Sequence, residues 1–153
     1  MTKQEIVRQL TAHLRQQVNT MRDAAKLAHE ASIGDEAKAE GKYDTRGLEA
    51  SYLAQAQAEQ YRKFADSLRI FESLTLAELP AGSVVEAGAL VETELDGVLS
   101  YFLLTPCAGG MTIDYHGCDL TSLSPDSPLY QSLLGTQAGD ILEPSGMMVL
   151  DVN

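Results

Sequence analysis

The sequence predicts an α+β protein, with an N-terminal antiparallel α-helical hairpin of the coiled-coil type before a small antiparallel-sheet domain with one short helix. Apolar residues recur every three or four positions in two long segments, and the first proline is Pro80. Residues 84–152 carry short apolar runs separated by turn residues, a pattern typical of strands. All 11 Lys and Arg residues lie between residues 3 and 69, so the net charge of −11 belongs to the second half.

The helical hairpin begins with a capping box, in which Thr2 and Glu5 each bond a free backbone amide of the other. The apolar stripe of the first helix comprises Ile6, Leu10, Leu14, Val18, Met21, Ala25 and Ala28. The stripe of the second comprises Leu53, Ala56, Tyr61, Phe64, Leu68, Phe71 and Leu74. Because a lone amphipathic helix has no apolar partner, we expect the two helices to pack on each other in opposite directions.

The change in composition divides the chain into two domains. We expect the hairpin over residues 1–76, with its tip at about residues 34–49. The Pro80-Ala81-Gly82 sequence marks a linker over residues 77–82. The sheet domain then occupies residues 83–153.

Turn and cap residues define the elements of the sheet domain. Asp96-Gly97 predicts a tight hairpin turn. Ser127 at a cap, Pro128 at the first helical position and Gly135 at the end predict a short helix. The expected strands are Val84–Leu95, Val98–Leu104, Met111–Asp114, Ile141–Leu142 and Met147–Val152.

The residues around the short helix resemble the bacterial Gre transcript-cleavage factors, as does the order of the two domains. The matching residues are Ser124-Pro125-Asp126-Ser127-Pro128-Leu129, Leu133-Leu134-Gly135 and Gly139-Asp140-Ile141. The resemblance implies an FKBP-like sheet domain that docks on the rim of the secondary channel of RNA polymerase. It assigns partner binding to Ser124, Asp126, Ser127, Pro128 and Leu129.

The same resemblance implies that acids at the hairpin tip enter the channel and help the polymerase to hold a second Mg²⁺, so that backtracked RNA is hydrolysed. Mg²⁺ prefers carboxylate oxygen, and the chain alone would bind no cofactor and would not be an enzyme. One register makes Asp44 and Glu49 the acids, followed by Tyr52, and gives the second helix nearly the family length. The other register uses Asp35, Glu36 and Glu40, ahead of Tyr43.

The tip acids also fit a simpler role on the surface. Asp44 is a residue type that caps helices, at the start of the second helix. Lys38, Lys42 and Arg46 are interleaved with the acids, so weak surface ion pairs would explain the same alternation. The family spaces its two acids three apart, whereas Asp44 and Glu49 are five apart. A relative that binds the channel without stimulating cleavage, as competitor or inhibitor, therefore stays open.

Three arginines, Arg8, Arg15 and Arg22, fall seven apart on one face of the first helix. In the Gre family a basic patch on the hairpin contacts the exiting RNA, so these residues are candidates for RNA contact within the polymerase complex. Pairing with Glu59 and Asp66 of the second helix is the simpler interpretation.

Other classes of function are weaker. Cys107, His116 and Cys118 have no spacing typical of zinc sites, and buried thiols would explain the cysteines. The acidic second half would be repelled by the phosphates of duplex DNA. Prolyl isomerisation wants an aromatic-lined pocket, for which the second half offers only Tyr101, Phe102, Tyr115 and Tyr130. Without a signal peptide or a long apolar run, we expect a cytoplasmic protein without membrane contact, monomeric when free.

Overall fold

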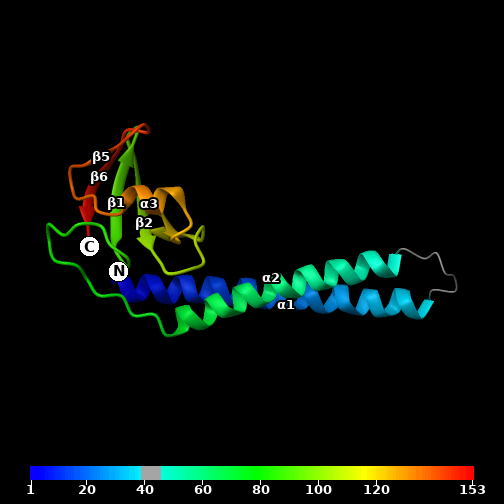
Figure 1. Cartoon of the computed structure of the whole chain (residues 1–153). Helices are drawn as coiled ribbons and strands as arrows, with labels where there is room; N and C mark the ends of the chain where they lie inside the picture. Colours follow the sequence, from blue (N-terminus) through cyan, green and yellow to red (C-terminus); the bar gives the residue numbers. More distant parts are fainter. Residues whose placement is uncertain (39–45) are drawn as a thin grey trace. The chain divides into compact units, whose positions relative to one another are not determined.

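The computed structural model describes the backbone of residues 1–38 and 46–153, and the side chains of those residues except 25, 28, 29, 32–38 and 46–54 (Figure 1). The elements are α1 (Lys3–Lys38), α2 (Arg46–Glu72), β1 (Leu90–Leu95), β2 (Val98–Leu104), β3 (Thr112–Tyr115), β4 (Cys118–Leu123), α3 (Pro128–Leu133), β5 (Ile141–Leu142) and β6 (Met147–Val152). The chain forms two compact units. We call Ala12–Arg69 the helical unit, and Met1–Thr11 with Ile70–Asn153 the sheet unit.

The helical unit consists of most of α1 and α2, which run side by side in opposite directions (Figure 1). Leu14 and Val18 of the expected α1 stripe are buried, and Phe64 and Leu68 of α2 are half-buried. Ala56 is exposed, so its place in the α2 stripe was wrong. It precedes Tyr61 by five positions, a step that turns a residue away from the face of a 3.6-residue helix. Ala25, Ala28 and Leu53 lie outside the described side chains.

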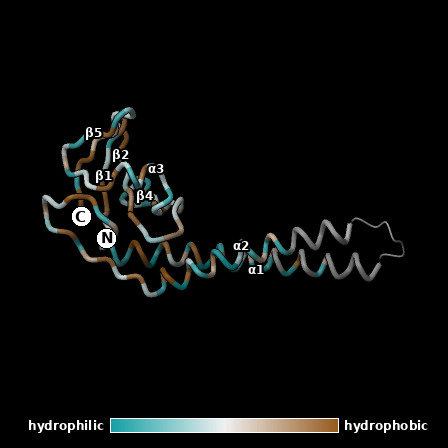
Figure 2. The backbone as a smooth tube through the Cα atoms, viewed as in Figure 1, coloured by the Kyte–Doolittle hydropathy of each residue, from teal (hydrophilic) through white to brown (hydrophobic). Residues whose placement is uncertain are grey.

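Neither long helix resembles a membrane span. Hydrophilic and hydrophobic residues alternate along the described turns of α1 (Figure 2). Over residues 1–38 and 46–153, no helix is both long enough and apolar enough to cross a bilayer.

The first turns of α1 belong to the sheet unit. The capping box is confirmed: the Thr2 amide donates to Glu5 Oε2 at 2.6 Å, and the Glu5 amide donates to Thr2 Oγ1 at 3.2 Å. Ile6, Val7 and Leu10 are at most 2% exposed. A segment at the start of the chain therefore contributes apolar side chains to a unit formed mainly by its second half.

The sheet has six strands in the order β3-β4-β2-β1-β6-β5. It is a mixed sheet, because β2 pairs with β4 in parallel, so the expected antiparallel sheet was wrong in this respect. The chain leaves β2, forms β3 at the edge and returns through β4 between the two, which makes β4 parallel to β2. Strand β4 was not expected from the sequence.

Strand β1 begins at Leu90 and not at Val84. The backbone of Val85 bonds instead to the segment after α3, since its amide donates to the Thr136 carbonyl at 2.7 Å. The Ala89 amide then donates to the Glu86 carbonyl at 3.0 Å, which closes a turn before the strand. The apolar residues from Val84 to Ala89 therefore lie in a turn and in a segment bonded to the residues after α3, and not in a strand.

The hairpin turn at Asp96-Gly97 is confirmed. Leu95 pairs directly with Val98, and the two turn residues have φ values of 52° and 79°. Positive φ at both positions is the type I′ geometry that this pair of residues favours. Tyr115 and Cys118 flank a second turn of the same length.

The main core lies between α3 and one face of the sheet, which we call the helix-side face. Tyr130 and Leu133 of α3 are at most 5% exposed there. The other members of this buried cluster are Val85, Ala89, Val91, Leu104, Leu123, Val149 and Val152. The opposite face begins with Leu90 and Leu103, which pair directly and are also buried.

Candidate partner-binding site

The segment that leads into α3, residues 124–135, is called the motif segment below. Its helix is confirmed: Ser127 Oγ accepts from the Tyr130 amide at 3.5 Å, and Pro128 occupies the first turn. The Leu134 amide closes the helix by donating to the Tyr130 carbonyl at 3.2 Å. Because Tyr130 and Leu133 are buried in the core, the helix is fixed to the sheet.

The start of the motif segment is held by its own polar groups. The Ser124 hydroxyl donates to the Asp126 carboxylate, and the Ser127 amide donates to the Ser124 carbonyl at 2.9 Å. The Gln131 amide group adds a bond from Nε2 to the Pro125 carbonyl at 2.7 Å. The hydroxyl of Ser124 lowers the pKa of Asp126 below its ordinary value, because it stabilises the ionised form. The segment therefore presents a carboxylate at a fixed position.

Gly109 lies directly against Ser124 at the start of the motif segment, and the sequence did not predict this contact. A Cβ at Gly109 would lie 2.5 Å from Ser124 Oγ and 2.7 Å from the Ser124 amide nitrogen. Only a residue without a side chain allows the two backbones to approach so closely. The Gly109-Gly110 pair was visible as a turn signal, but nothing in the sequence indicated what it would touch.

The outer surface of the motif segment suits a protein partner. Pro125, Asp126 and Pro128 are exposed, whereas Leu129 is partly buried against the core. A rigid surface of two prolines and one carboxylate loses little conformational entropy when it binds. Of the five residues that the resemblance assigns to partner binding, Asp126 and Pro128 are exposed, and Ser124, Ser127 and Leu129 are partly buried.

The proposed tip acids lie outside the described side chains. Asp35 and Glu36 fall within α1 and Glu49 within α2, but their side chains are not described. Glu40 and Asp44 fall in residues 39–45, outside the described residues altogether. Both registers of the tip therefore remain predictions.

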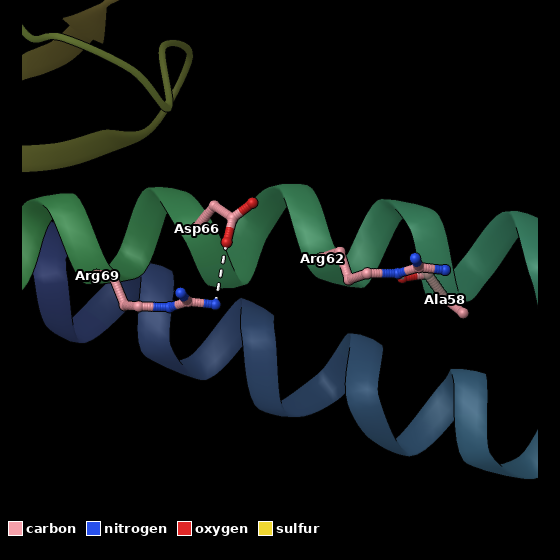
Figure 3. A network of polar contacts seen from close by, with 4 residues as sticks. All are labelled: Ala58, Arg62, Asp66 and Arg69. Carbon is pink, nitrogen blue, oxygen red and sulfur yellow. Dashed lines mark hydrogen bonds and ion pairs between the residues drawn. The ribbon is translucent and has the colours of Figure 1, made fainter.

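The three arginines of α1 are all exposed, and Arg8 lies in the sheet unit. The Thr2 amide lowers the pKa of Glu5 most, and the charge of Arg8 lowers it further. Asp66, one expected partner of the stripe, forms an ion pair with Arg69 of its own helix at 3.0 Å (Figure 3).

A second polar contact within α2 lies close to that ion pair. Arg62 donates from Nε to the Ala58 carbonyl at 3.4 Å, also within α2 (Figure 3). Both of these contacts connect residues of one helix.

Neither Cys107 nor Cys118 forms a disulfide, and both are only partly buried, which corrects the expectation of buried thiols. His116 lies exposed in the turn before β4, with its ring 4.5 Å from that of Tyr115. Tyr115 in turn lies 4.7 Å from Tyr101. Among the residues whose side chains the structure describes, no three His, Cys, Asp or Glu gather as a metal site would require.

Fold and site together define an α+β protein with a pair of long helices and a sheet unit that carries a loop held by its own hydrogen bonds. No protein-family model matches the chain, and no curated protein matches its sequence.

Solved structures that match include GreA factor homolog 1 (Gfh1) of Thermus thermophilus, at 25% identity over 94% of both chains with a TM-score of 0.37. Another structure of the transcription factor Gfh1 matches at 26% identity over 94% of this chain and 92% of that one, with a TM-score of 0.38. Thermus aquaticus Gfh1 matches at 22% identity over 93% and 92%, with a TM-score of 0.36. At TM-scores this low, the matches do not establish a family for this chain.

Proposed function

We propose that this chain is a Gre-type transcription elongation factor that binds RNA polymerase at the secondary channel and stimulates cleavage of backtracked RNA. The motif segment carries the proposal: a Ser-x-x-Ser-Pro-Leu sequence of the Gre type forms a serine-capped helix with an exposed, ordered carboxylate. The long helix pair supports it, because α1 alone has 36 residues, or about 54 Å at 1.5 Å per residue. That is long enough to reach into a channel.

In this proposal the two units have separate tasks. The motif segment binds the polymerase rim, where ionised Asp126 meets a donor or a cation of the partner and the prolines supply apolar contact. The tip carries Asp44 and Glu49 to the active site of the polymerase. When bound there, a second Mg²⁺ would polarise the phosphate and activate water. The chain contributes the position of the carboxylates and no catalytic group that acts alone.

A regulator that occupies the channel without stimulating cleavage is the second candidate. The spacing of Asp44 and Glu49, five positions instead of three, is the observation that favours it. Such a protein would use the motif segment in the same way but would compete with a cleavage factor.

RNA cleavage by stalled, backtracked complexes of the host polymerase tests both candidates, with and without the full chain over a range of Mg²⁺. We expect faster cleavage, and loss of the effect in the Asp44→Asn/Glu49→Gln double variant. Asp35→Asn/Glu36→Gln is the matched control, because it removes the same number of charges, two of the three acids, from the other register. Loss of stimulation in the control alone would transfer the role to the second register.

A docking variant separates binding from chemistry. Asp126→Asn keeps the shape of the motif segment and removes its charge, so we expect weaker polymerase binding with an unchanged maximal cleavage rate at saturation. No stimulation by the unmodified chain, together with competition against an active cleavage factor, would support the regulator. Neither stimulation nor polymerase binding would refute both candidates.

A further inference from the structure

The opposite face of the sheet carries a row of side chains across four neighbouring strands. Ile141 of β5 pairs with Met148 of β6, Met148 pairs with Glu94 of β1, and Glu94 pairs with Leu99 of β2. Directly paired residues of antiparallel strands point to the same face, so the four side chains lie next to one another. With three strand spacings of about 4.8 Å, this open row is about 14 Å long.

The apolar members of the open row are exposed to solvent. Ile141 is 52% exposed, Met148 38% and Leu99 39%. At the other end of the same face, Leu90 and Leu103 are at most 5% exposed. Large apolar side chains that gather in one exposed patch are typical of interaction surfaces, whereas single ones are ordinary. One half of this face is therefore covered, and the open row is not.

Two carboxylates lie beside the open row. Glu92 pairs directly with Asp151, so two carboxylates face each other across neighbouring strands, an arrangement that destabilises a sheet. Asp151 accepts a bond from Asn153 Nδ2 at 2.9 Å, and Glu92 lies opposite Tyr101. Residues 75–153 contain no Lys or Arg, and the sheet unit has two basic side chains in α1: Lys3, whose Nζ donates to the Ala77 carbonyl at 2.7 Å, and the exposed Arg8. A cation from outside would relieve the repulsion.

We propose that the open row is the docking surface for a basic amphipathic helix of a protein partner. A length of 14 Å corresponds to about nine helical residues, which present apolar side chains at positions i, i+4 and i+7 on one face. These side chains would contact Ile141, Met148 and Leu99, while flanking Lys or Arg would meet Glu92 and Asp151.

The negative charge beside the open row favours a basic helix over a second copy of this chain. Two copies of the chain that stacked open row on open row would bring Glu92, Glu94 and Asp151 against their own equivalents, and would repel each other. The surface is also separate from the motif segment, because Tyr130 and Leu133 pack on the helix-side face. The proposal therefore does not depend on the proposed function.

Three helix-forming peptides of equal length serve as probes for the full chain. The first has a leucine stripe flanked by lysines, the second has glutamates in place of the lysines, and the third keeps the lysines but has glutamine in place of the leucines. Binding is measured by fluorescence anisotropy and located by backbone amide NMR shifts. The test variant is Leu99→Ser/Met148→Ser, and the control is Val84→Ser, which changes a 47%-exposed residue outside the row.

We expect binding of the first peptide only, with amide shifts along the open row. The double variant should weaken binding about tenfold or more, since it removes two apolar contacts, and the control should not. Glu92→Gln/Asp151→Asn should reduce the dependence of affinity on salt. No binding, equal affinity for the double variant, or shifts confined to other surfaces would overturn the proposal. A dimer in sedimentation that the double variant dissociates would instead assign the row to a second copy.

Discussion

The contact between Gly109 and Ser124 allows a direct test of how the motif segment is held. In a Gly109→Ala variant the new Cβ would meet the Ser124 amide nitrogen at 2.7 Å, where ordinary contact begins at 3.4 Å. The loop would have to retreat by about 0.7 Å, and overpacking of this kind costs about 1–3 kcal/mol of unfolding free energy. The new Cβ would also lie 2.5 Å from Ser124 Oγ, so the hydroxyl would have to turn away and would lose its bond to Asp126.

Chemical denaturation measures the stability of this variant, and NMR measures the displacement. We expect a lower free energy of unfolding together with shifted amide signals for residues 122–127. Gly117→Ala is the control: with φ of 80° it costs about 1–2 kcal/mol of backbone strain, but its Cβ meets nothing within 4 Å. The control should therefore lose similar stability without moving the Ser124 signals. Unchanged Ser124 and Asp126 signals in Gly109→Ala would refute the reasoning.

Three other predictions concern single side chains. Ser124→Ala should raise the pKa of Asp126 toward its ordinary value of 3.8, which carboxyl NMR titration checks. The lowered pKa of Asp126 stabilises the fold above pH 3.8, and this stabilisation is lost as the pH falls through the folded pKa. The variant lacks this contribution, so it should lose less stability on acidification. Asp151→Asn should raise the free energy of unfolding by about 0.2–1 kcal/mol by relieving repulsion from Glu92, and a decrease in urea denaturation would contradict this. Leu133→Ala should cost about 2–5 kcal/mol, since Leu133 is fully buried, and a loss below 1 kcal/mol in the same assay would show that its neighbours collapse into the space.

Local chemistry explains which elements could be predicted. The Thr2–Glu5 capping box, the Asp96-Gly97 turn and the Ser127-Pro128 helix start each depend on residues within a few positions of one another. Their hydrogen bonds and φ values follow from neighbouring residues and do not require a distant part of the chain.

The missed features depend on distant contacts. Strand β4 pairs in parallel with β2, and no local signal encodes which strand will lie beside it. Gly117 does provide a turn signal in the sequence, because glycine favours the positive φ that this turn requires, so the β3–β4 hairpin could have been found. The contact of Gly109 with Ser124 joins positions fifteen apart, and only the folded sheet reveals it.

The candidate functional residues also divide into those that the local sequence predicts and those that depend on distant contacts. The motif segment could be predicted because its sequence builds its own cap and helix. The open row could not, because Ile141, Met148 and Leu99 belong to three strands whose register sets their neighbourhood.

The division of the sheet unit into two segments determines what a protease can isolate. Trypsin cuts after Lys and Arg, and the segment from Ile70 to Asn153 contains neither, so it would survive as one piece. The other segment, Met1–Thr11, has tryptic sites at Lys3, which is only 1% exposed, and at Arg8, which is exposed. Removing that segment would take away Ile6, Val7 and Leu10 and leave apolar surface uncovered. A recombinant fragment cut at the Pro80 linker would carry the same defect, so the sheet unit is best produced with the start of α1 reattached.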